Sequence, residues 1–355
     1  MNKILLTGGG SAGHITVNLA LIPLLTKAGW TITYLGSFDG IEKELISDVP
    51  EVTYYGISTG KLRRYFDLKN FTDIFRILKG ILEAYKIVRK IKPDLVFSKG
   101  GFVSVPVVIG SKLNNVPIIT HESDLTPGLA NRINMNFAQK ICTTFPDTLQ
   151  YLPSKKGEFI GAIVRPKLQQ GNTQKGRNYC QFYSDKPVIL VVGGSLGSWS
   201  INKIIRSSLD TLLTKFQIIH ICGKGNLEPD VKPTGYKQVE YVSDELPDLI
   251  SLCNLAISRA GSNFIFEFLA LKKPMILIPL PKKSSRGDQI ENARIFQRQG
   301  FAEMILEENL TTDCLLDLIN TVFTNREKYI SQMKTLNSDR ALHKLFNLIN
   351  TFGAK

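Results

Sequence analysis

The stretch ILLTGGGSAGH at residues 4–14 is a short apolar run that leads directly into a glycine-rich turn. The same order of features returns at residues 188–197, which read VILVVGGSLG. A buried strand, a glycine loop and a following helical pattern together open a βαβ unit. Two such openings about 180 residues apart predict two doubly wound, Rossmann-like α/β domains.

Apolar runs of strand length alternate with segments of helical length on both sides of these openings. The predicted strands are residues 4–7, 31–35, 52–55, 94–97, 117–120 and 140–144, and then 188–192, 217–221, 255–258 and 275–279; a helix is predicted at 201–213. The polar stretch 169–178 predicts a linker or long loop. We therefore expect domains at 1–164 and 165–355, with a C-terminal helix that can cross back to the first domain. The two domains are expected to face each other across a cleft that collects the strand ends.

Composition limits the classes of function. The 355 residues are 43% hydrophobic and carry 44 Lys and Arg against 31 Asp and Glu, a formal net charge of +13. This charge favours an acidic partner, such as anionic lipid or a phosphorylated substrate. Five widely spaced cysteines without a C-x-x-C pair indicate neither a zinc knuckle nor a redox pair, and are typical of a reducing cytosol. No apolar run approaches the ~18 residues that span a bilayer, so membrane contact is expected to be peripheral.

The glycine loops are compatible with more than one ligand. Gly8, Gly10 and Gly13 satisfy the G-x-G-x-x-G pattern of dinucleotide sites, but the predicted second strand ends at residues 35–37 without an acid for the ribose. An NAD-dependent oxidoreductase and a turn without a ligand both remain alternatives. Neither loop is followed by a Walker A lysine, and the chain contains no D-x-D motif for a metal-bound diphosphate. Helix N-termini and basic side chains would then stabilise a diphosphate leaving group.

Several motifs in order resemble one family. They are residues 8–14, SKGGFVS at 98–104, HESD at 121–124, GGSLG at 193–197, SRAGSN at 258–263, Glu267, and DQIENA at 288–293. Their order and spacing resemble the MurG family of glycosyltransferase family 28, and the resemblance covers nearly the whole chain. It implies the GT-B architecture and an inverting, metal-independent reaction without a cofactor. In that reaction N-acetylglucosamine passes from UDP-N-acetylglucosamine to the 4-hydroxyl of lipid I, giving lipid II of peptidoglycan.

The resemblance also implies site residues. The donor-binding positions that match the family are Ser11, Ala12, Gly13, Asp124, Arg165, Gly194, Ser195, Val242, Ser262, Glu267, Gln289 and Asn292. Among them Glu267 matches the acid that binds the ribose, and Ser195 matches the residue that touches the diphosphate. Asp124 stands where many relatives have Asn. His14 is expected to be the catalytic base, and Glu122 is the alternative.

A basic and aromatic cluster is expected to bind the membrane. Arg63, Arg64, Tyr65, Phe66 and Phe71 combine charge with aromatic rings, which suits anionic headgroups at the cytoplasmic face of the cell membrane. No nucleic-acid-binding signature is present, so nucleic acid is not expected as a partner. Other cell-wall synthesis proteins are possible partners. A diacylglycerol glycosyltransferase remains an alternative within the same architecture, and a membrane-bound sensor of nucleotide sugars is a non-enzymatic one.

Overall fold

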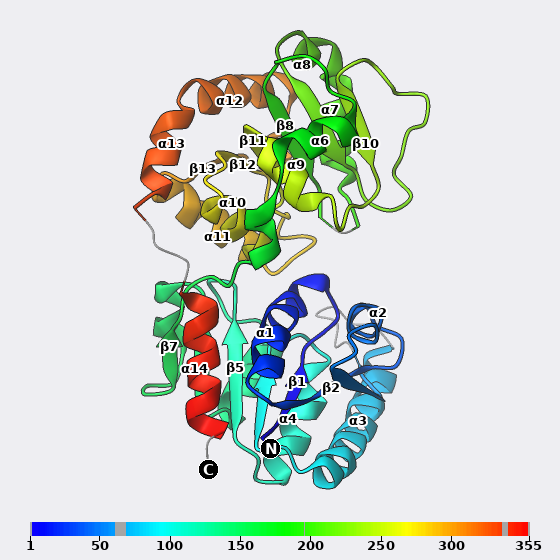
Figure 1. The fold of residues 1–355 in the computed structure, drawn as a ribbon, viewed down its shortest axis with the longest axis vertical. Coiled ribbons are helices and arrows are strands. Elements are labelled where there is room, and N and C mark those ends of the chain that lie inside the picture. The colour runs from blue at the N-terminus through cyan, green and yellow to red at the C-terminus, as the bar shows by residue number, and fades with distance from the viewer. Residues whose placement is uncertain (1, 61–68, 195, 336–339, 354–355) are drawn as a thin grey trace. The chain divides into compact units, whose positions relative to one another are not determined.

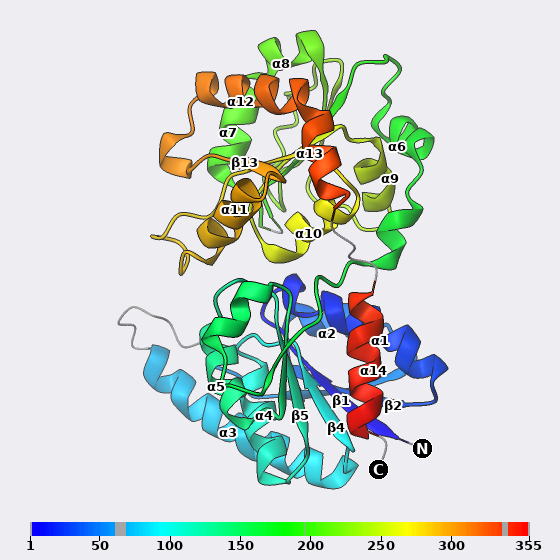
Figure 2. The same ribbon diagram turned by 90° about the vertical axis from the view of Figure 1, so that its left-hand side faces the viewer.

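The computed structural model describes residues 2–60, 69–194, 196–335 and 340–353. The chain divides into two compact units (Figures 1 and 2). The N-terminal unit consists of Met1–Ile163 and the returning segment Ser338–Lys355, and the C-terminal unit is Val164–Asn337. Each unit has its own parallel sheet, which confirms the predicted fold of two parallel-sheet α/β domains.

The N-terminal unit is built on a seven-stranded sheet in the order β3-β2-β1-β4-β5-β6-β7, and all its pairs are parallel. Its strands are β1 (Lys3–Thr7), β2 (Thr31–Ser37), β3 (Val52–Ile57), β4 (Leu95–Ser98), β5 (Ile118–Glu122), β6 (Lys140–Thr143) and β7 (Gly157–Phe159). Its helices are η1 (Ala12–His14), α1 (Thr16–Lys27), α2 (Ile41–Ile46), α3 (Lys69–Ile91), α4 (Ser104–Leu113), α5 (Leu129–Phe137), η2 (Pro146–Tyr151) and α14 (Ala341–Gly353).

Alternation along β1 creates two cores in this unit. Ile4 and Leu6 point to one face, where they join a cluster that includes residues of α1 and α14. Leu5 points to the other face, into a cluster with residues of α3 and α4. Successive side chains on a strand face opposite sides, so an unbroken apolar strand must be covered by helices on both faces.

The last helix belongs to the N-terminal unit. Figure 1 shows α14 beside α1, and the two helices are in contact. Trp30 Nε1 donates a hydrogen bond to Asn350 Oδ1 at 3.0 Å, and Gly353 packs against the same indole ring. Leu345 and Ile349 are completely buried in the core beneath. Segments from the two ends of the chain therefore form one hydrophobic core.

The C-terminal unit has a six-stranded sheet in the order β10-β9-β8-β11-β12-β13, again entirely parallel. Its strands are β8 (Val188–Val192), β9 (Gln217–Ile221), β10 (Tyr236–Val239), β11 (Leu255–Ser258), β12 (Met275–Leu277) and β13 (Ala302–Met304). Its helices are η3 (Pro166–Gln170), α6 (Thr173–Cys180), α7 (Trp199–Ser207), α8 (Leu209–Lys215), α9 (Leu246–Leu252), α10 (Ser262–Ala270), α11 (Asp288–Arg298), η4 (Glu307–Asn309), α12 (Thr312–Thr324) and α13 (Arg326–Met333).

Two local predictions were wrong. The stretch predicted as a linker contains α6, because the Asn172 side chain caps the helix by accepting from the Lys175 N–H at 3.0 Å, and Gly176 packs closely on α9. The single helix predicted at 201–213 is two helices, α7 and α8. The hydroxyls of Ser207 and Ser208 donate to the Ile204 carbonyl at 3.0 and 2.7 Å, and such bonds compete with the helical ladder.

Candidate functional site

The first glycine loop connects β1 to η1. Gly10 has a φ of +83°, and a Cβ placed there would lie 2.3 Å from a ring carbon of Phe102. Only glycine therefore fits this turn. Beyond it Ser11 is exposed, Gly13 and His14 are half-buried in η1, and the His14 N–H donates to the Ser11 carbonyl at 3.1 Å. Ala12 is the first residue of η1.

A buried carboxylate occupies the space beneath this loop. Glu42 from α2 is completely buried, and its Oε2 accepts from the Gly10 N–H at 3.1 Å. Its Oε1 accepts from the Ser37 N–H at 3.0 Å and from the Ser37 hydroxyl at 2.5 Å. A phosphate here would lose the Gly10 donor and would face a carboxylate. This arrangement disfavours a dinucleotide site at the first loop.

Glu122, the last residue of β5, is tied to the loop that follows it. Its Oε1 accepts from the Asp124 N–H at 2.9 Å, and its Oε2 accepts from the Gly128 N–H and from Asn131 Nδ2, both at 3.0 Å. The residue is 3% exposed. Burial and then the charge of Asp124 raise the pKa of its carboxyl, against the hydrogen bond from Asn131. The carboxylate therefore braces residues 122–131, and Asp124 itself is half-buried.

Two more buried ionisable groups lie at the ends of these strands. Lys99 directly follows β4, is 1% exposed, and its Nζ donates to Ser123 Oγ at 2.9 Å. Burial lowers the pKa of this amine, while the charges of Glu122 and Asp124 raise it. His121 is also buried, with Nε2 3.3 Å from Thr144 Oγ1. Burial, and then the charges of Lys99 and His14, hold the pKa of His121 well below its usual value, so this imidazole is neutral.

The second glycine loop follows β8 in the C-terminal unit. Gly194 is half-buried with a φ of +98°, and the Gly197 N–H donates to its carbonyl at 3.0 Å. Ser198 then caps α7 by accepting from the Ile201 N–H. A loop that leads into a capped helix N-terminus presents N–H groups to an anion. Ser195, the predicted diphosphate contact, lies outside the described residues.

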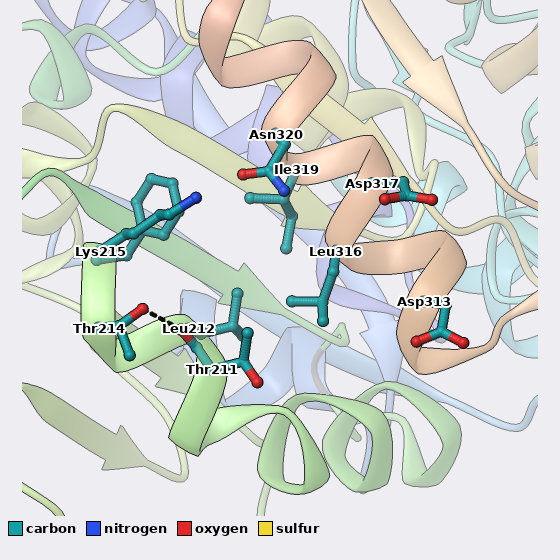
Figure 3. A pocket seen from close by; sticks show the side chains of 10 residues that line it. Thr211, Leu212, Thr214, Lys215, Asp313, Leu316, Asp317, Ile319 and Asn320 are labelled. Atoms are coloured by element: carbon teal, nitrogen blue, oxygen red, sulfur yellow. Dashed lines mark hydrogen bonds between the residues drawn. The ribbon is translucent and has the colours of Figure 1, made fainter.

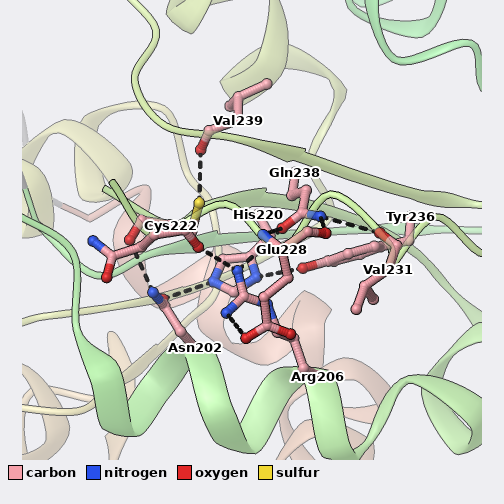
Figure 4. Close-up of polar contacts among 10 residues, drawn as sticks. Asn202, Arg206, His220, Cys222, Glu228, Val231, Tyr236, Gln238 and Val239 are labelled. Carbon is pink, nitrogen blue, oxygen red and sulfur yellow. Dashed lines mark hydrogen bonds and ion pairs between the residues drawn. The ribbon is translucent and has the colours of Figure 1, made fainter. Parts of the chain in front are cut away.

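A buried network braces this second loop (Figure 4). Asn202 of α7 donates to the Cys222 carbonyl at 2.9 Å, and its Oδ1 pairs with His220 Nε2 at 3.0 Å. The Nδ1 of the same imidazole pairs with the Tyr236 hydroxyl at 2.8 Å. A Cβ on Gly197 would lie 2.0 Å from the Cys222 carbonyl oxygen, so the loop rests directly on this network.

Arg165 and Glu267 form a two-pronged ion pair in the C-terminal unit. Arg165 Nε donates to Glu267 Oε1 at 2.7 Å, and its Nη2 donates to Oε2 at 2.9 Å. Glu267 lies in α10 and is 2% exposed, whereas the arginine side chain is 36% exposed. Burial raises the pKa of the Glu267 carboxyl, and its bonds with Arg165 oppose that rise. The acid that the family match assigns to the ribose is therefore a paired, buried carboxylate.

The remaining predicted donor residues also lie in the C-terminal unit. Ser262 begins α10, and both Ser262 and Val242 are buried. Gln289, in the first turn of α11, accepts from the Leu280 N–H at 3.1 Å. Asn292 is completely buried and donates to the Ala260 carbonyl at 3.1 Å, and this bond fixes α11 to the loop after β11.

The membrane-binding prediction falls mostly outside the described residues. Arg63, Arg64, Tyr65 and Phe66 belong to the undescribed segment, and Phe71 lies in the first turn of α3. The described part of α3 nevertheless exposes large apolar side chains. Phe75 is 72% exposed and Leu82 is 63% exposed. Among the helices that the structure describes, none is long and apolar enough to cross a membrane.

A separate hollow of about 460 Å³ lies between α8 and α12 (Figure 3). Its lining includes Lys215, Asp313 and Asp317, and it contains none of the predicted site residues. Within the described ranges, no cluster of three or more His, Cys, Asp or Glu side chains has the arrangement of a metal site.

Among the buried charged residues that sequence reasoning missed, Glu42, Lys99 and Arg259 lie closest to the predicted site segments. Arg259 follows β11, and its guanidinium contacts Ser198 and Glu307. A possible signal was their position next to glycine loops or strand ends. Charged residues there usually face solvent, however, and only the tertiary contacts reveal their burial.

Comparison with known proteins agrees with the fold of two parallel-sheet units. Residues 4–143 match the glycosyltransferase family 28 N-terminal domain, and residues 188–346 match the C-terminal domain of the same family. A relative from Geobacillus kaustophilus is 55% identical over 98% of both chains. One from Clostridium tetani is 53% identical over 99% of this chain and 98% of its own. Both are named UDP-N-acetylglucosamine--N-acetylmuramyl-(pentapeptide) pyrophosphoryl-undecaprenol N-acetylglucosamine transferase.

The solved structure of MurG from Acinetobacter baumannii has the same fold, with a TM-score of 0.77 and 24% identity over 99% of this chain and 100% of that one. The two family models, the full-length relatives and the two parallel-sheet units agree. The chain therefore belongs to glycosyltransferase family 28 and is a sugar-transferring enzyme.

Proposed function

We propose that this protein transfers N-acetylglucosamine from UDP-N-acetylglucosamine to the 4-hydroxyl of the N-acetylmuramyl residue of lipid I, which gives lipid II for peptidoglycan synthesis. The observation that carries the proposal is the 55% identity, over 98% of both chains, with a relative that bears this activity in its name. The likeness is spread over both halves of the chain, since the family models match residues in each unit.

The C-terminal unit binds the donor in this proposal. Glu267 binds the ribose hydroxyls while it remains paired with Arg165, since each carboxylate oxygen can accept a second hydrogen bond. The second glycine loop, with Ser195 and the N-terminus of α7, receives the diphosphate. Gln289 contacts the donor sugar, and backbone near Val242 contacts the uracil. The burial of Glu267 in its ion pair with Arg165 supports this, because a buried carboxylate is an expensive feature that binding sites retain.

The chemistry is a direct displacement at the anomeric carbon. The acceptor oxygen forms a bond to that carbon while its proton passes to a base, and UDP departs with the electrons of the broken bond, so the configuration inverts. We assign the base to His14. Glu122 is the weaker candidate, because its two oxygens already accept three hydrogen bonds from Asp124, Gly128 and Asn131. We propose that no metal ion is required, and that the α7 N-terminus stabilises the leaving diphosphate.

The protein works at an anionic membrane surface in this proposal, on its cytoplasmic side. The lipid-linked acceptor requires such contact. The exposed face of α3 supplies apolar side chains at Phe75, Leu78 and Leu82, with the basic residues Arg76 and Lys79 on the same helix. Apolar groups enter the headgroup boundary while the cations attract anionic lipid.

The decisive experiment incubates the purified protein with radiolabelled UDP-N-acetylglucosamine and a short-chain lipid I analogue. We expect a disaccharide lipid product, and much less transfer from UDP-glucose. Diacylglycerol replaces the acceptor in a parallel reaction. Transfer to diacylglycerol but not to the lipid I analogue would assign the protein to glycolipid synthesis instead. Tight binding of NADH without any transfer would favour the oxidoreductase alternative, which the position of Glu42 disfavours.

A further inference from the structure

A buried arginine joins four segments at the carboxyl end of the second sheet. Arg259 is 9% exposed, and its Nη2 donates to Ser198 Oγ at 2.6 Å. Its Nη1 donates to the carbonyls of Ile278 and Pro279, at 3.1 and 3.2 Å, just beyond β12. The same nitrogen lies 2.5 Å from Glu307 Oε2 in η4, after β13. One guanidinium therefore connects the ends of β11, β12 and β13 with the start of α7.

Its contact with Ser198 is the one closest to the second glycine loop. Ser198 is the N-cap of α7, and its Oγ also accepts from the Ile201 N–H. The loop leaves this serine little freedom: a Cβ on Gly193 would lie 2.7 Å from the Ser198 nitrogen. The position of Ser198 therefore determines where the loop runs and where the first N–H groups of α7 point.

An arginine suits this position better than a lysine. The planar guanidinium reaches the serine hydroxyl with one nitrogen and the strand-end carbonyls with another, whereas a lysine ammonium is a single point charge. Glu307 balances the buried positive charge at 2.5 Å, which limits the cost of its desolvation. Nothing else at the start of α7 supplies such a charge to the cap hydroxyl among the residues described.

We propose that Arg259 is a positioning residue for the donor diphosphate. By fixing Ser198, it holds the second glycine loop and the start of α7 in the arrangement that receives phosphate. The inference rests on the proposed use of a UDP-sugar and adds to it a residue that need not touch the substrate. The inference requires that replacing Arg259 lower the affinity for UDP, which carries the diphosphate, and leave the affinity for uridine unchanged.

The test compares titration calorimetry of UDP and of uridine on the full-length protein. Arg259→Met should weaken UDP binding by about tenfold to a hundredfold, the worth of a charge-assisted hydrogen bond, and leave uridine affinity within about twofold. Arg259→Lys should recover part of the loss. Ser198→Ala should show the same selective loss, and the double variant should be no worse than the worse single variant. Arg177→Met, which changes a partly exposed arginine bonded to the Ser184 carbonyl, is the matched control and should bind both ligands normally.

Three results would overturn the inference. Equal loss of uridine and UDP affinity would make Arg259 a general stabilising residue of the unit. Additive losses in the double variant would separate Arg259 from Ser198. If Arg259→Met does not fold, Ser198→Ala alone decides, and unchanged UDP binding by that variant refutes the inference. A parent protein that binds UDP no better than uridine would instead defeat the donor assignment itself, before any substitution is made.

Discussion

The paired carboxylate at Glu267 offers the sharpest test of the donor site. Both of its oxygens bond to Arg165, at 2.7 and 2.9 Å, and the residue is 2% exposed. If it also accepts the ribose hydroxyls, those are hydrogen bonds to a charged group, worth ~1.5–3 kcal/mol. Glu267→Ala should therefore lower UDP affinity by about tenfold to 150-fold.

Truncation of Glu267 also leaves the Arg165 guanidinium without its partner, so the loss of ribose contacts must be separated from a loss of folding. The ligand 2′,3′-dideoxy-UDP removes the hydroxyls without touching the protein. The parent should bind UDP ~1.5–3 kcal/mol more tightly than the dideoxy analogue, and Glu267→Ala should bind the two alike.

Calorimetric titration of both ligands on both proteins completes this cycle. Arg165→Met is the companion variant, because it keeps the carboxylate and removes only its partner; it should retain a preference for UDP over the analogue. The reasoning is refuted if the parent binds the two nucleotides equally, or if Glu267→Ala still prefers UDP. In either case Glu267 would serve only to hold Arg165.

Four further predictions concern catalysis, the metal requirement, membrane attachment and pH. His14→Ala should lower kcat by ~10²–10⁴-fold with little change in the donor KM, whereas Glu122→Gln should mainly lower the melting temperature; the reverse pattern in steady-state kinetics and thermal melts would exchange their roles. Activity should survive EDTA, and complete loss that Mg²⁺ restores would contradict a metal-independent reaction. Replacing Arg63 and Arg64 with Ser should weaken sedimentation with anionic vesicles, by ~1 kcal/mol per charge, without slowing turnover of a short-chain acceptor; unchanged sedimentation would move the contact elsewhere. Burial, with a smaller effect from Arg206, lowers the pKa of His220 to about 3. Below pH ~6.5 the unfolded chain therefore binds a proton at this residue that the folded chain does not bind. This residue should therefore reduce the free energy of unfolding by ~1.4 kcal/mol per unit as pH falls from ~6.5 towards its folded value, and urea titrations of the parent and of His220→Gln should differ in that slope.

Most strands of the two sheets could be predicted from the sequence alone. The largely apolar segments at 188–192, 217–221 and 255–258 coincide with β8, β9 and β11, because mostly apolar strands are the pattern that a sheet covered on both faces requires. The strands that were not predicted are β7, β10 and β13, all short and all at or near sheet edges. An edge strand such as Tyr236–Val239 is partly polar, so its pattern resembles that of a loop.

The candidate site divides in the same way. The order of the motifs pointed to His14 and Glu267 from the sequence alone, since each lies in or beside a short contiguous motif. The motif order did not reveal that the Glu122 carboxylate accepts hydrogen bonds from the segment that follows it, such as the one from the Gly128 N–H. Nor did it reveal that the Glu42 carboxylate accepts from the Gly10 N–H beneath the first glycine loop. Those facts depend on which side chains meet after residues distant in sequence are brought together.

The sequence by itself therefore determined the two parallel-sheet units, the glycine loops that open them, and the family, because these follow from periodicity and from short contiguous motifs. Only the tertiary structure decided which charged side chains are buried and which residues they bond to. Arg259 and Ser198 are 61 residues apart, and Arg165 and Glu267 are 102 apart. A carboxylate or guanidinium prefers water unless the fold supplies its partners, and no local pattern encodes a partner that arrives from another strand end.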